Sequence, residues 1–411
     1  PRPTHLSYRV SPLVSDRSAE VPQSFIREIR KIAGDPSVIS FAGGLPNRTL
    51  FPVDEIRAAA DTVLTTAGRE VLQYSNSEGY LPLREWISER YRTRQGLDIP
   101  VDNILITTGS QQGLDLLGKS CINDHDPVVI EEPGYLGAIQ AFSIFRPTFL
   151  PVPVTELGMD LGRLDQALQN TTPKLLYTVA NFSNPAGITY TEANREAMAE
   201  RLIGKPTFLI QDDPYGELRF TGSHQKSFAH YLPQQTLLLG SFSKTVVPAF
   251  RIGWIVAPDR LMEKLIIAKQ ASDLHTDYFA QRVLYQYLLD NDLDAHIARI
   301  TAVYGRHRDA MVTEIAHHFP AEVHATQPEG GMFLWVTLPE GLSSMVLFER
   351  AIAEKVAFVP GHPFYIGRAW TNDLRLNFSC VDEAAIATGI ERLSAVLHAE
   401  LEAPRAANRA G

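Results

Sequence analysis

Several features that mark secreted, metal-binding or membrane-spanning proteins are scarce or missing in this sequence. Only two of its 411 residues are cysteines, Cys121 and Cys380, and they form no C-x-x-C pair. We therefore expect neither a disulfide framework nor a zinc knuckle. The twelve histidines contain no H-E-x-x-H motif, and we predict no metal site. No apolar run approaches the roughly 20 residues of a transmembrane helix. The first ten residues lack the apolar segment of a secretory signal, which predicts a cytoplasmic protein.

An excess of positive charge is also missing. The formal net charge is −9 at pH 7, whereas nucleic acids and anionic membranes are bound by dense basic surfaces. The one basic cluster, Arg90 to Arg94, ends an amphipathic helical pattern, and we interpret it as a solvated face. We expect neither a nucleic-acid nor a membrane partner. The length and the 45% apolar content suit a globular protein of two or three domains.

Short apolar runs alternate with helical patterns through the middle of the chain. Such alternation predicts an α/β fold, with a mostly parallel sheet sandwiched by helices. The predicted strands are residues 104–107, 128–130, 148–152, 174–179, 207–210, 237–239 and 252–256.

The C-terminal part has a different pattern. A long helical pattern over residues 292–319 is followed by strand patterns at 331–336 and 373–378, each with a helical neighbour. This predicts a smaller α+β domain. We place the large domain at residues 49–300 and build the small one from residues 1–48 and 301–411, with a short helix expected near 22–33.

Polar residues gather where the predicted strands of the large sheet end. Ligands of parallel α/β sheets bind beyond the carboxyl ends of the strands. A shared position there is stronger evidence for a site than any single motif, because each of these residues also fits an ordinary turn, cap or half-buried position. The residues are Ser110, Tyr135, Asn184, Asp212 and Lys244.

The stretch from Ser241 to Trp254 carries the most specific chemistry. It combines Ser241, Ser243 and Lys244 with Arg251, seven residues after the lysine. A lysine amine freed by desolvation condenses with aldehydes, and hydroxyl and guanidinium groups bind phosphate. An aldehyde and a phosphate together describe pyridoxal 5'-phosphate (PLP). A surface turn with a solvated lysine is the alternative.

Two charged residues on apolar strands require partners of opposite charge. Asp212 ends the strand predicted at 207–210, and its carboxylate would keep the ring nitrogen of PLP protonated. Arg375 lies in the strand predicted at 373–378 and suits a substrate carboxylate. A strand-end acidic turn and a structural ion pair are the respective alternatives.

One phosphate-binding motif is misleading. Residues Gly113 to Ser120 match the Walker A spacing G-x-x-x-x-G-K-S. A P-loop must follow a strand directly. These residues instead continue a helix whose strand junction lies earlier, at Gly109. We reject the nucleotide-hydrolase reading.

Taken together, the motifs resemble the fold-type I PLP-dependent aminotransferases of class I/II, above all the 2-aminoadipate and kynurenine (multisubstrate) subgroup. The resemblance covers about residues 21–394. It is carried by residues 40–46 (SFAGGLP), 72–75 (LQYS), 107–112 (TTGSQQ), 184–187 (NPAG), 212–215 (DDPY), 241–244 (SFSK) with Arg251, and 374–376 (LRL).

The resemblance assigns roles around the cofactor. It implies that Lys244 forms a Schiff base with PLP and then carries the substrate's proton. Asp212 pairs with the ring nitrogen, Asn184 and Tyr215 hold the ring oxygen, and Tyr135 stacks on the ring. The phosphate would be held by Ser110, Gln111, Ser241, Ser243 and Arg251. Tyr74 would reach the phosphate of a partner subunit, which implies a homodimer with active sites at the interface.

The resemblance also assigns the substrate contacts. Arg375, Asn184 and the backbone at Gly44 would hold the substrate's carboxylate. Arg27 matches an N-terminal arginine that, in some relatives, receives a distal carboxylate. One departure is Ala186, where the family more often has Thr or Ser, and it could loosen the turn after Asn184.

The expected function is the transfer of an α-amino group to a 2-oxo acid, expected to be 2-oxoglutarate, in a ping-pong cycle. Aromatic amino acids, 2-aminoadipate, leucine, kynurenine and arylglycines all stay open as donors. A PLP-dependent lyase, decarboxylase or oxidase is the first alternative, since one fold hosts many reactions. A ligand-sensing regulator domain is the second, but residues 1–48 are too short and too poor in basic helical pattern for a DNA-binding domain.

Overall fold

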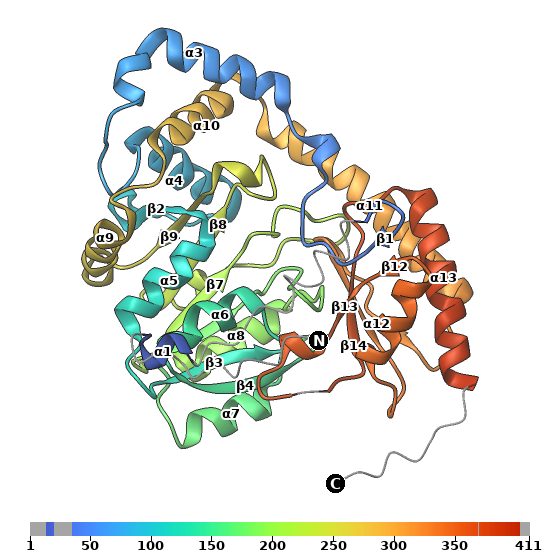
Figure 1. Ribbon diagram of the computed structural model, residues 1–411. Coiled ribbons are helices and arrows are strands. Elements are labelled where there is room, and N and C mark those ends of the chain that lie inside the picture. The colour runs from blue at the N-terminus through green and yellow to red at the C-terminus, as the bar shows by residue number, and fades with distance from the viewer. Residues whose placement is uncertain (1–13, 20–34, 369, 403–411) are drawn as a thin grey trace, which may run out of the picture.

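The structure is a computed structural model that describes residues 14–19, 35–368 and 370–402 (Figure 1). An eight-stranded sheet forms its larger part, in the order β2-β9-β8-β7-β6-β3-β4-β5. Neighbouring strands from β4 through β8 are parallel, whereas β9 and β5 run antiparallel to their neighbours. The strands are β2 (Ile104–Thr108), β3 (Pro127–Glu132), β4 (Thr148–Thr155), β5 (Gly158–Met159), β6 (Leu175–Thr178), β7 (Phe208–Asp212), β8 (Thr236–Ser241) and β9 (Ile252–Val256).

The prediction of a mostly parallel sheet is therefore confirmed, with two details that the sequence pattern missed. The short edge strand β5 was not predicted. The direction of β9 was not anticipated either, and it follows from the connection after β8. Only residues 242–251 join these two strands, and they contain no α-helix. A parallel return needs a crossover of a dozen or more residues, so the chain turns back instead.

Helices cover both faces of this sheet, as alternating side chains of β2 demonstrate. Leu105 is in a buried cluster with Leu114 of α5, whereas Ile104 and Ile106 are in a second cluster with Leu284 of α10. Figure 1 shows α3 lying against α10. The helices of this part are α3 (Val53–Val71), α4 (Leu81–Gln95), α5 (Gly109–Cys121), α6 (Leu136–Ser143), α7 (Leu161–Gln169), α8 (Glu192–Leu202), α9 (Asp259–Asp273) and α10 (Tyr278–Asp290).

A smaller α+β part follows, as predicted. Its antiparallel sheet has the order β10-β11-β14-β13, and β1 pairs in parallel with β12 beside it. Figure 1 shows α11 and α13 packed side by side over this region. The elements are β1 (Ile39–Ser40), α11 (Leu293–His318), β10 (His324–Ala325), β11 (Phe333–Thr337), α12 (Ser344–Ala353), β12 (Val356–Ala357), β13 (Val359–Pro360), β14 (Asp373–Asn377) and α13 (Glu383–Glu402).

Short elements complete the described chain. The helix expected near residues 22–33 lies outside the described residues. Across the ranges that the structure does describe, we find no helix both long and apolar enough to span a bilayer. The short helices are α1 (Asp16–Ala19) and the 3-10 turns Arg48–Leu50, Val101–Asn103, Phe228–His230, Pro248–Phe250 and His362–Phe364.

The structure also tests the interpretations of the Walker A spacing and of the basic cluster. The residues with Walker A spacing, Gly113 to Ser120, lie inside α5, so they form no P-loop. The solvated-face interpretation of the basic cluster is wrong for Arg90. Its side chain is only 17% exposed and pairs with Glu217 and Asp294. The partners lie more than 120 residues away in sequence, which local charge patterning does not reveal.

Candidate active site

The predicted site residues come from successive strand ends of the large sheet. Asp212 is the last residue of β7, Lys244 follows β8, and Asn184 follows β6. Tyr135 directly precedes α6 after β3, and Ser110 lies in the first turn of α5 after β2. Because β8, β7, β6 and β3 are neighbours in the sheet, these side chains gather at one edge.

Asp212 is a buried carboxylate with an incomplete set of partners. It is 2% exposed, and its Oδ2 atom accepts a hydrogen bond of 2.7 Å from the Tyr177 hydroxyl. Its Oδ1 atom is buried and has no hydrogen-bond partner within residues 14–19, 35–368 and 370–402. Burial raises the pKa of Asp212 to about 7, against the lowering effect of the Tyr177 hydroxyl. A cationic donor at Oδ1 would restore the ionised form.

Arg375 is the corresponding cation in the small antiparallel sheet. It is 3% exposed in the middle of β14, and it donates to Asn184 Oδ1 at 2.7 Å and to the Ala42 carbonyl at 3.0 Å. Its Nε atom is buried and has no hydrogen-bond partner in the part of the chain that the structure describes. Burial lowers the pKa of Arg375 to about 10, so the group stays charged at neutral pH and needs an anion.

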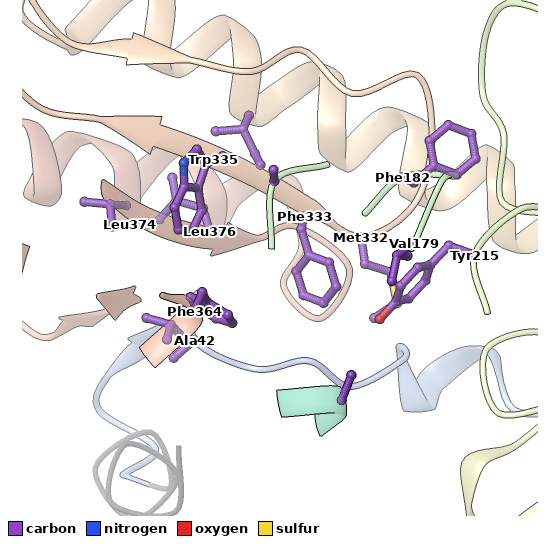
Figure 2. Packing of buried hydrophobic residues seen from close by; sticks show 14 of the residues in the cluster. Ala42, Val179, Phe182, Tyr215, Met332, Phe333, Trp335, Phe364, Leu374 and Leu376 are labelled. Atoms are coloured by element: carbon purple, nitrogen blue, oxygen red, sulfur yellow. The ribbon is translucent and has the colours of Figure 1, made fainter. Parts of the chain in front are cut away.

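Aromatic rings surround Arg375. Its guanidinium lies 4.4 Å from the ring centre of Phe333 and 5.4 Å from that of Phe364. Figure 2 shows Phe333 beside Tyr215, and the two rings meet edge to face at 5.8 Å. These rings exclude water from the guanidinium, and that strengthens any hydrogen bond it makes to a substrate carboxylate.

Asn184 and Tyr215 connect the two ends of the site. Asn184 follows β6, accepts from Arg375 at 2.7 Å and shares a side-chain hydrogen bond with Tyr215. Burial raises the pKa of the Tyr215 hydroxyl, so it stays protonated and can donate. These two hydrogen bonds of Asn184 therefore connect Arg375, on the small sheet, to residues at the edge of the large sheet.

Lys244 and Gly44 lie between those two ends. The Lys244 amine donates to the carbonyl of Gly44 at 2.9 Å. A Cβ atom built on Gly44 would lie 3.9 Å from Arg375 Nη2 and 3.8 Å from the Phe333 ring. The Gly44 backbone thus passes between the lysine and the arginine, close to both.

The residues predicted to bind the phosphate form a second group, around the start of α5. No side chain caps this helix, so its first N–H groups stay available to an anion. Arg251 packs against Gly109, where a Cβ atom would meet Arg251 Nη2 at 2.3 Å, and its Nη1 lies 3.5 Å from Ser243 Oγ. Ser241 Oγ accepts from the Ser243 backbone N–H at 3.0 Å.

Two predicted residues of this group have other contacts in the structure. The Gln111 side chain donates to the Gly137 carbonyl at 2.7 Å and lies 3.5 Å from the Tyr135 hydroxyl. Tyr74 is 78% exposed, and its ring packs edge-on against His275. The single chain therefore does not bury Tyr74 among the other site residues. Arg27 lies outside the described residues.

Sequence reasoning missed several residues of the site. Tyr177 and Phe333 were placed only as positions within predicted strands, and Phe364 lay in no predicted element. Away from the residues assigned to the cofactor, the hydrogen bond of Tyr190 to buried Glu131 on β3, at 2.6 Å, was also missed. The only available signal was strand alternation, which places Tyr177 on the same face as Val179. Alternation does not tell which neighbouring strand supplies a partner.

Comparison with known proteins identifies the class. Residues 38–393 match the family described as aminotransferase class I and II. The chain belongs to this family and is an aminotransferase, as the resemblance in the sequence had predicted.

Three relatives illustrate the match. The chain is 40% identical over 400 residues to aromatic-amino-acid aminotransferase 1 of Thermococcus litoralis, covering 94% of each chain. It superposes on the kynurenine aminotransferase of Pyrococcus horikoshii, solved in complex with PMP, with a TM-score of 0.91 and 40% identity. That match covers 96% of this chain and 99% of the other. For LysN, the α-aminoadipate aminotransferase of Thermus thermophilus complexed with N-(5'-phosphopyridoxyl)-L-leucine, the TM-score is 0.88 at 38% identity, covering 94% and 98%.

The cofactor of this family is PLP, and the geometry of the site fits it. The buried, unpartnered Oδ1 atom of Asp212 matches a protonated ring nitrogen. The uncapped start of α5 and Arg251 match a phosphate. The half-buried Lys244 amine matches an aldehyde. Each part of the cofactor therefore has a complementary group on the chain.

Proposed function

We propose that the protein moves the α-amino group of an aromatic, 2-aminoadipate-type or branched-chain amino acid to a 2-oxo acid, with 2-oxoglutarate as the acceptor, in a ping-pong cycle. The observation that carries this proposal is the 2.7 Å hydrogen bond from Arg375 to Asn184. It joins the arginine suited to the substrate's carboxylate to a residue suited to the cofactor's ring oxygen. A substrate held by that arginine is therefore held next to the ring.

When bound, PLP supplies an aldehyde that condenses with amines and a ring that accepts electrons from a bond at the substrate's α-carbon. Asp212 holds the positive charge of the ring nitrogen, because no cationic side chain in the described part of the chain makes a hydrogen bond to its carboxylate. Tyr215 and Asn184 donate to the ring oxygen. Tyr135 covers one ring face, and its side chain orients the cofactor by stacking.

Lys244 moves the proton. Its amine, held 2.9 Å from the Gly44 carbonyl, takes the proton from the α-carbon of the amino acid. It then delivers that proton to the carbon that carries the amino group in the aminated cofactor. The reverse movement serves the 2-oxo acid. The neighbouring Gly44 backbone and Arg375 fix the carboxylate, so that the α-carbon stays within reach of the lysine.

The phosphate is bound by hydroxyl, guanidinium and backbone N–H donors at the edge of the sheet. We assign Arg251 as the ionic partner of the phosphate, since its side chain already packs on the backbone at Gly109. The other donors that we propose are Ser110, Gln111, Ser241 and Ser243.

We further propose a homodimer in which Tyr74 completes the phosphate site of the partner subunit. Support comes from its 78% exposure, and from two exposed apolar residues near it: Leu72, 71% exposed and two residues before Tyr74, and Leu274, 53% exposed and next to His275, whose ring contacts that of Tyr74. Exposed apolar clusters of this kind mark protein interfaces.

The remaining assignments concern organisation and substrate choice. We propose a large PLP-binding domain of residues 49–300 and a small domain of residues 1–48 and 301–411, in a cytoplasmic enzyme. Arg27 is proposed to receive the distal carboxylate of acidic substrates. The carboxylate at the α-carbon is common to all donors, so discrimination must come from contacts with the rest of the side chain.

A half-reaction screen tests the proposed function. Purified protein with bound PLP is mixed with single amino acids, and the visible band of the cofactor is followed. We expect phenylalanine, leucine, kynurenine or 2-aminoadipate to bleach the band, and 2-oxoglutarate to restore it. Release of ammonia or CO₂ without any oxo acid would instead establish a lyase or a decarboxylase.

A further inference from the structure

A buried tyrosine lies behind the carboxylate that we assign to the cofactor's ring nitrogen. Tyr177 is in β6, and it is in register with Ile210 of the neighbouring parallel strand β7. Asp212 is two residues beyond Ile210, so its side chain projects from the same face of the sheet. The Tyr177 hydroxyl reaches along β7 and donates to Asp212 Oδ2 at 2.7 Å.

The tyrosine ring has little freedom to move. Tyr177 is completely buried, and its ring meets the ring of Phe142 edge to face, with centres 6.2 Å apart. Phe142 belongs to α6, the helix that begins directly after Tyr135. One helix therefore supports both the tyrosine proposed to stack on the cofactor and the tyrosine that holds Asp212.

The hydrogen bond fixes the direction of the carboxylate as well as its charge. With Oδ2 bonded to Tyr177, only Oδ1 is left for another donor, and this atom has no hydrogen-bond partner among the residues that the structure describes. A rigid donor on one oxygen also favours the ionised over the protonated carboxylate.

We propose that Tyr177 is a positioning residue for the cofactor, whose hydroxyl aims Asp212 at the ring nitrogen and favours the charged pair between them. The proposal rests on the assignment of Asp212 to that nitrogen in the proposed function. In the charged pair the proton stays on the ring, which makes the ring the stronger electron acceptor. Loss of the hydroxyl shifts the proton toward Asp212 and weakens the pair.

Four other ionisable groups lie near Asp212, and two of them are acidic and work against its ionised form. Asp213, next along the chain, and Glu131, on β3, are both acidic and interact with Asp212 as like charges. Tyr135 and Tyr215 are the other nearby hydroxyls, and burial raises the pKa of Tyr215. Tyr177, and none of these four groups, makes a hydrogen bond to Asp212 among the described residues.

The chain contains a matched control for this contact. The hydroxyl of Tyr190, also completely buried, donates to Glu131 Oε1 at 2.6 Å. Tyr190→Phe removes the same kind of bond, from a tyrosine to a buried carboxylate, but from a carboxylate that we do not assign to the cofactor. It therefore controls for the structural cost of losing such a bond.

The experiment compares wild type, Tyr177→Phe and Tyr190→Phe as full-length proteins with bound PLP. The first readout is the dissociation constant of PLP from equilibrium dialysis, and the second is the pH midpoint of the cofactor's visible band. For Tyr177→Phe we expect roughly tenfold weaker binding, typical of losing a hydrogen bond to a charged group. A less positive ring holds the proton at the lysine linkage more tightly, so the midpoint should move to higher pH. Tyr190→Phe should leave both readouts unchanged within about twofold.

A double-mutant cycle shows whether Tyr177 acts through Asp212. In the Asp212→Asn background, Tyr177→Phe should change PLP affinity by less than about twofold. Equal PLP affinity and equal midpoints in wild type and Tyr177→Phe would overturn the proposal. A full effect of Tyr177→Phe in the Asp212→Asn background, or the same effect from Tyr190→Phe, would overturn it as well. Failure of the wild type to bind PLP would instead refute the proposed function itself.

Discussion

The site contains two buried charges of opposite sign on two different sheets, and they differ in how they tolerate burial. Asp212, at the end of β7, and Arg375, within β14, are each nearly inaccessible, and each has one buried atom with no hydrogen-bond partner among the described residues. Burial raises the pKa of Asp212 to about 7 but lowers that of Arg375 only to about 10. Without ligands, the carboxyl sheds its charge near neutral pH, whereas the guanidinium cannot.

The difference matches how long each of the two proposed ligands stays bound. In the proposed function, the cofactor stays bound through many cycles and supplies a lasting cation to Asp212, so this residue depends on the cofactor for its ionised form. The substrate that we propose for Arg375 leaves after each half-reaction, so the arginine must stay charged in its absence. Its contacts with Asn184, Ala42 and two aromatic rings hold the charged group between turnovers.

The largest expected effect comes from the cofactor end of this comparison. Asp212→Asn removes the charge that holds the ring nitrogen protonated, and we expect kcat to fall about 100- to 1000-fold, the usual loss for one electrostatic contact in a water-excluded site. Asp213→Asn is the matched control, because that neighbouring carboxylate accepts from Asn181 instead. Steady-state kinetics with phenylalanine and 2-oxoglutarate measures both. Similar kcat losses in the two variants would remove the special role of Asp212.

The substrate end should respond in KM. Arg375→Ala leaves the α-carboxylate without its fork of donors, and we expect KM to rise roughly 30- to 300-fold for every α-amino acid. The KM of Arg375→Lys should lie between the KM values of wild type and Arg375→Ala, since a lysine keeps the charge but not the planar fork. PLP content, read from the absorbance of the released cofactor, should stay at the wild-type level. Loss of PLP from Arg375→Ala would count against a substrate role for Arg375, because the arginine would then act on the cofactor, as Asp212 does.

A smaller and more selective effect is expected from Arg27→Ala. If Arg27 binds a distal carboxylate, the variant should lower kcat/KM for glutamate and 2-aminoadipate about tenfold or more, the cost of one lost charged contact. Values for phenylalanine and leucine should change little. Measured across the four donors, an equal loss for acidic and apolar substrates would exclude Arg27 from substrate selection.

The smallest effect concerns pH and stability without cofactor. The pKa of Asp212 is raised to about 7 in the folded chain and is near 3.9 when unfolded. The folded state therefore binds the extra proton between about pH 4 and 7, and its stability should decrease as pH rises through this window. Burial raises the pKa of Glu131 to about 7 as well, so it should add a second contribution of the same sign.

Urea denaturation at several pH values separates these two carboxyl groups. Asp212→Asn and Glu131→Gln should each remove part of the decrease. Added PLP should cancel only the part due to Asp212, because only that carboxylate gains a cation. If PLP cancels the part due to Glu131 instead, the two carboxylates have been assigned to the wrong roles.

The sequence allowed us to predict most of the fold and the polar residues at the strand ends, and the reason is physical. Parallel strands buried on both faces are continuously apolar, so polar residues such as Asp212 and Lys244 stand out where these strands end. Contacts between distant segments gave no such signal. The hydrogen bond from Tyr177 to Asp212, the ion pairs of Arg90 and the rings around Arg375 depend on strand order and register. The direction of β9 was missed because apolar patterning does not encode strand polarity.

The most direct test of the account is to find where PLP attaches. The protein with bound PLP is reduced with borohydride, digested and mapped by mass spectrometry. The account predicts one phosphopyridoxyl group per chain, on Lys244, and none in Lys244→Ala, which should also lack transaminase activity. A label on another lysine, or full activity in Lys244→Ala, would contradict it.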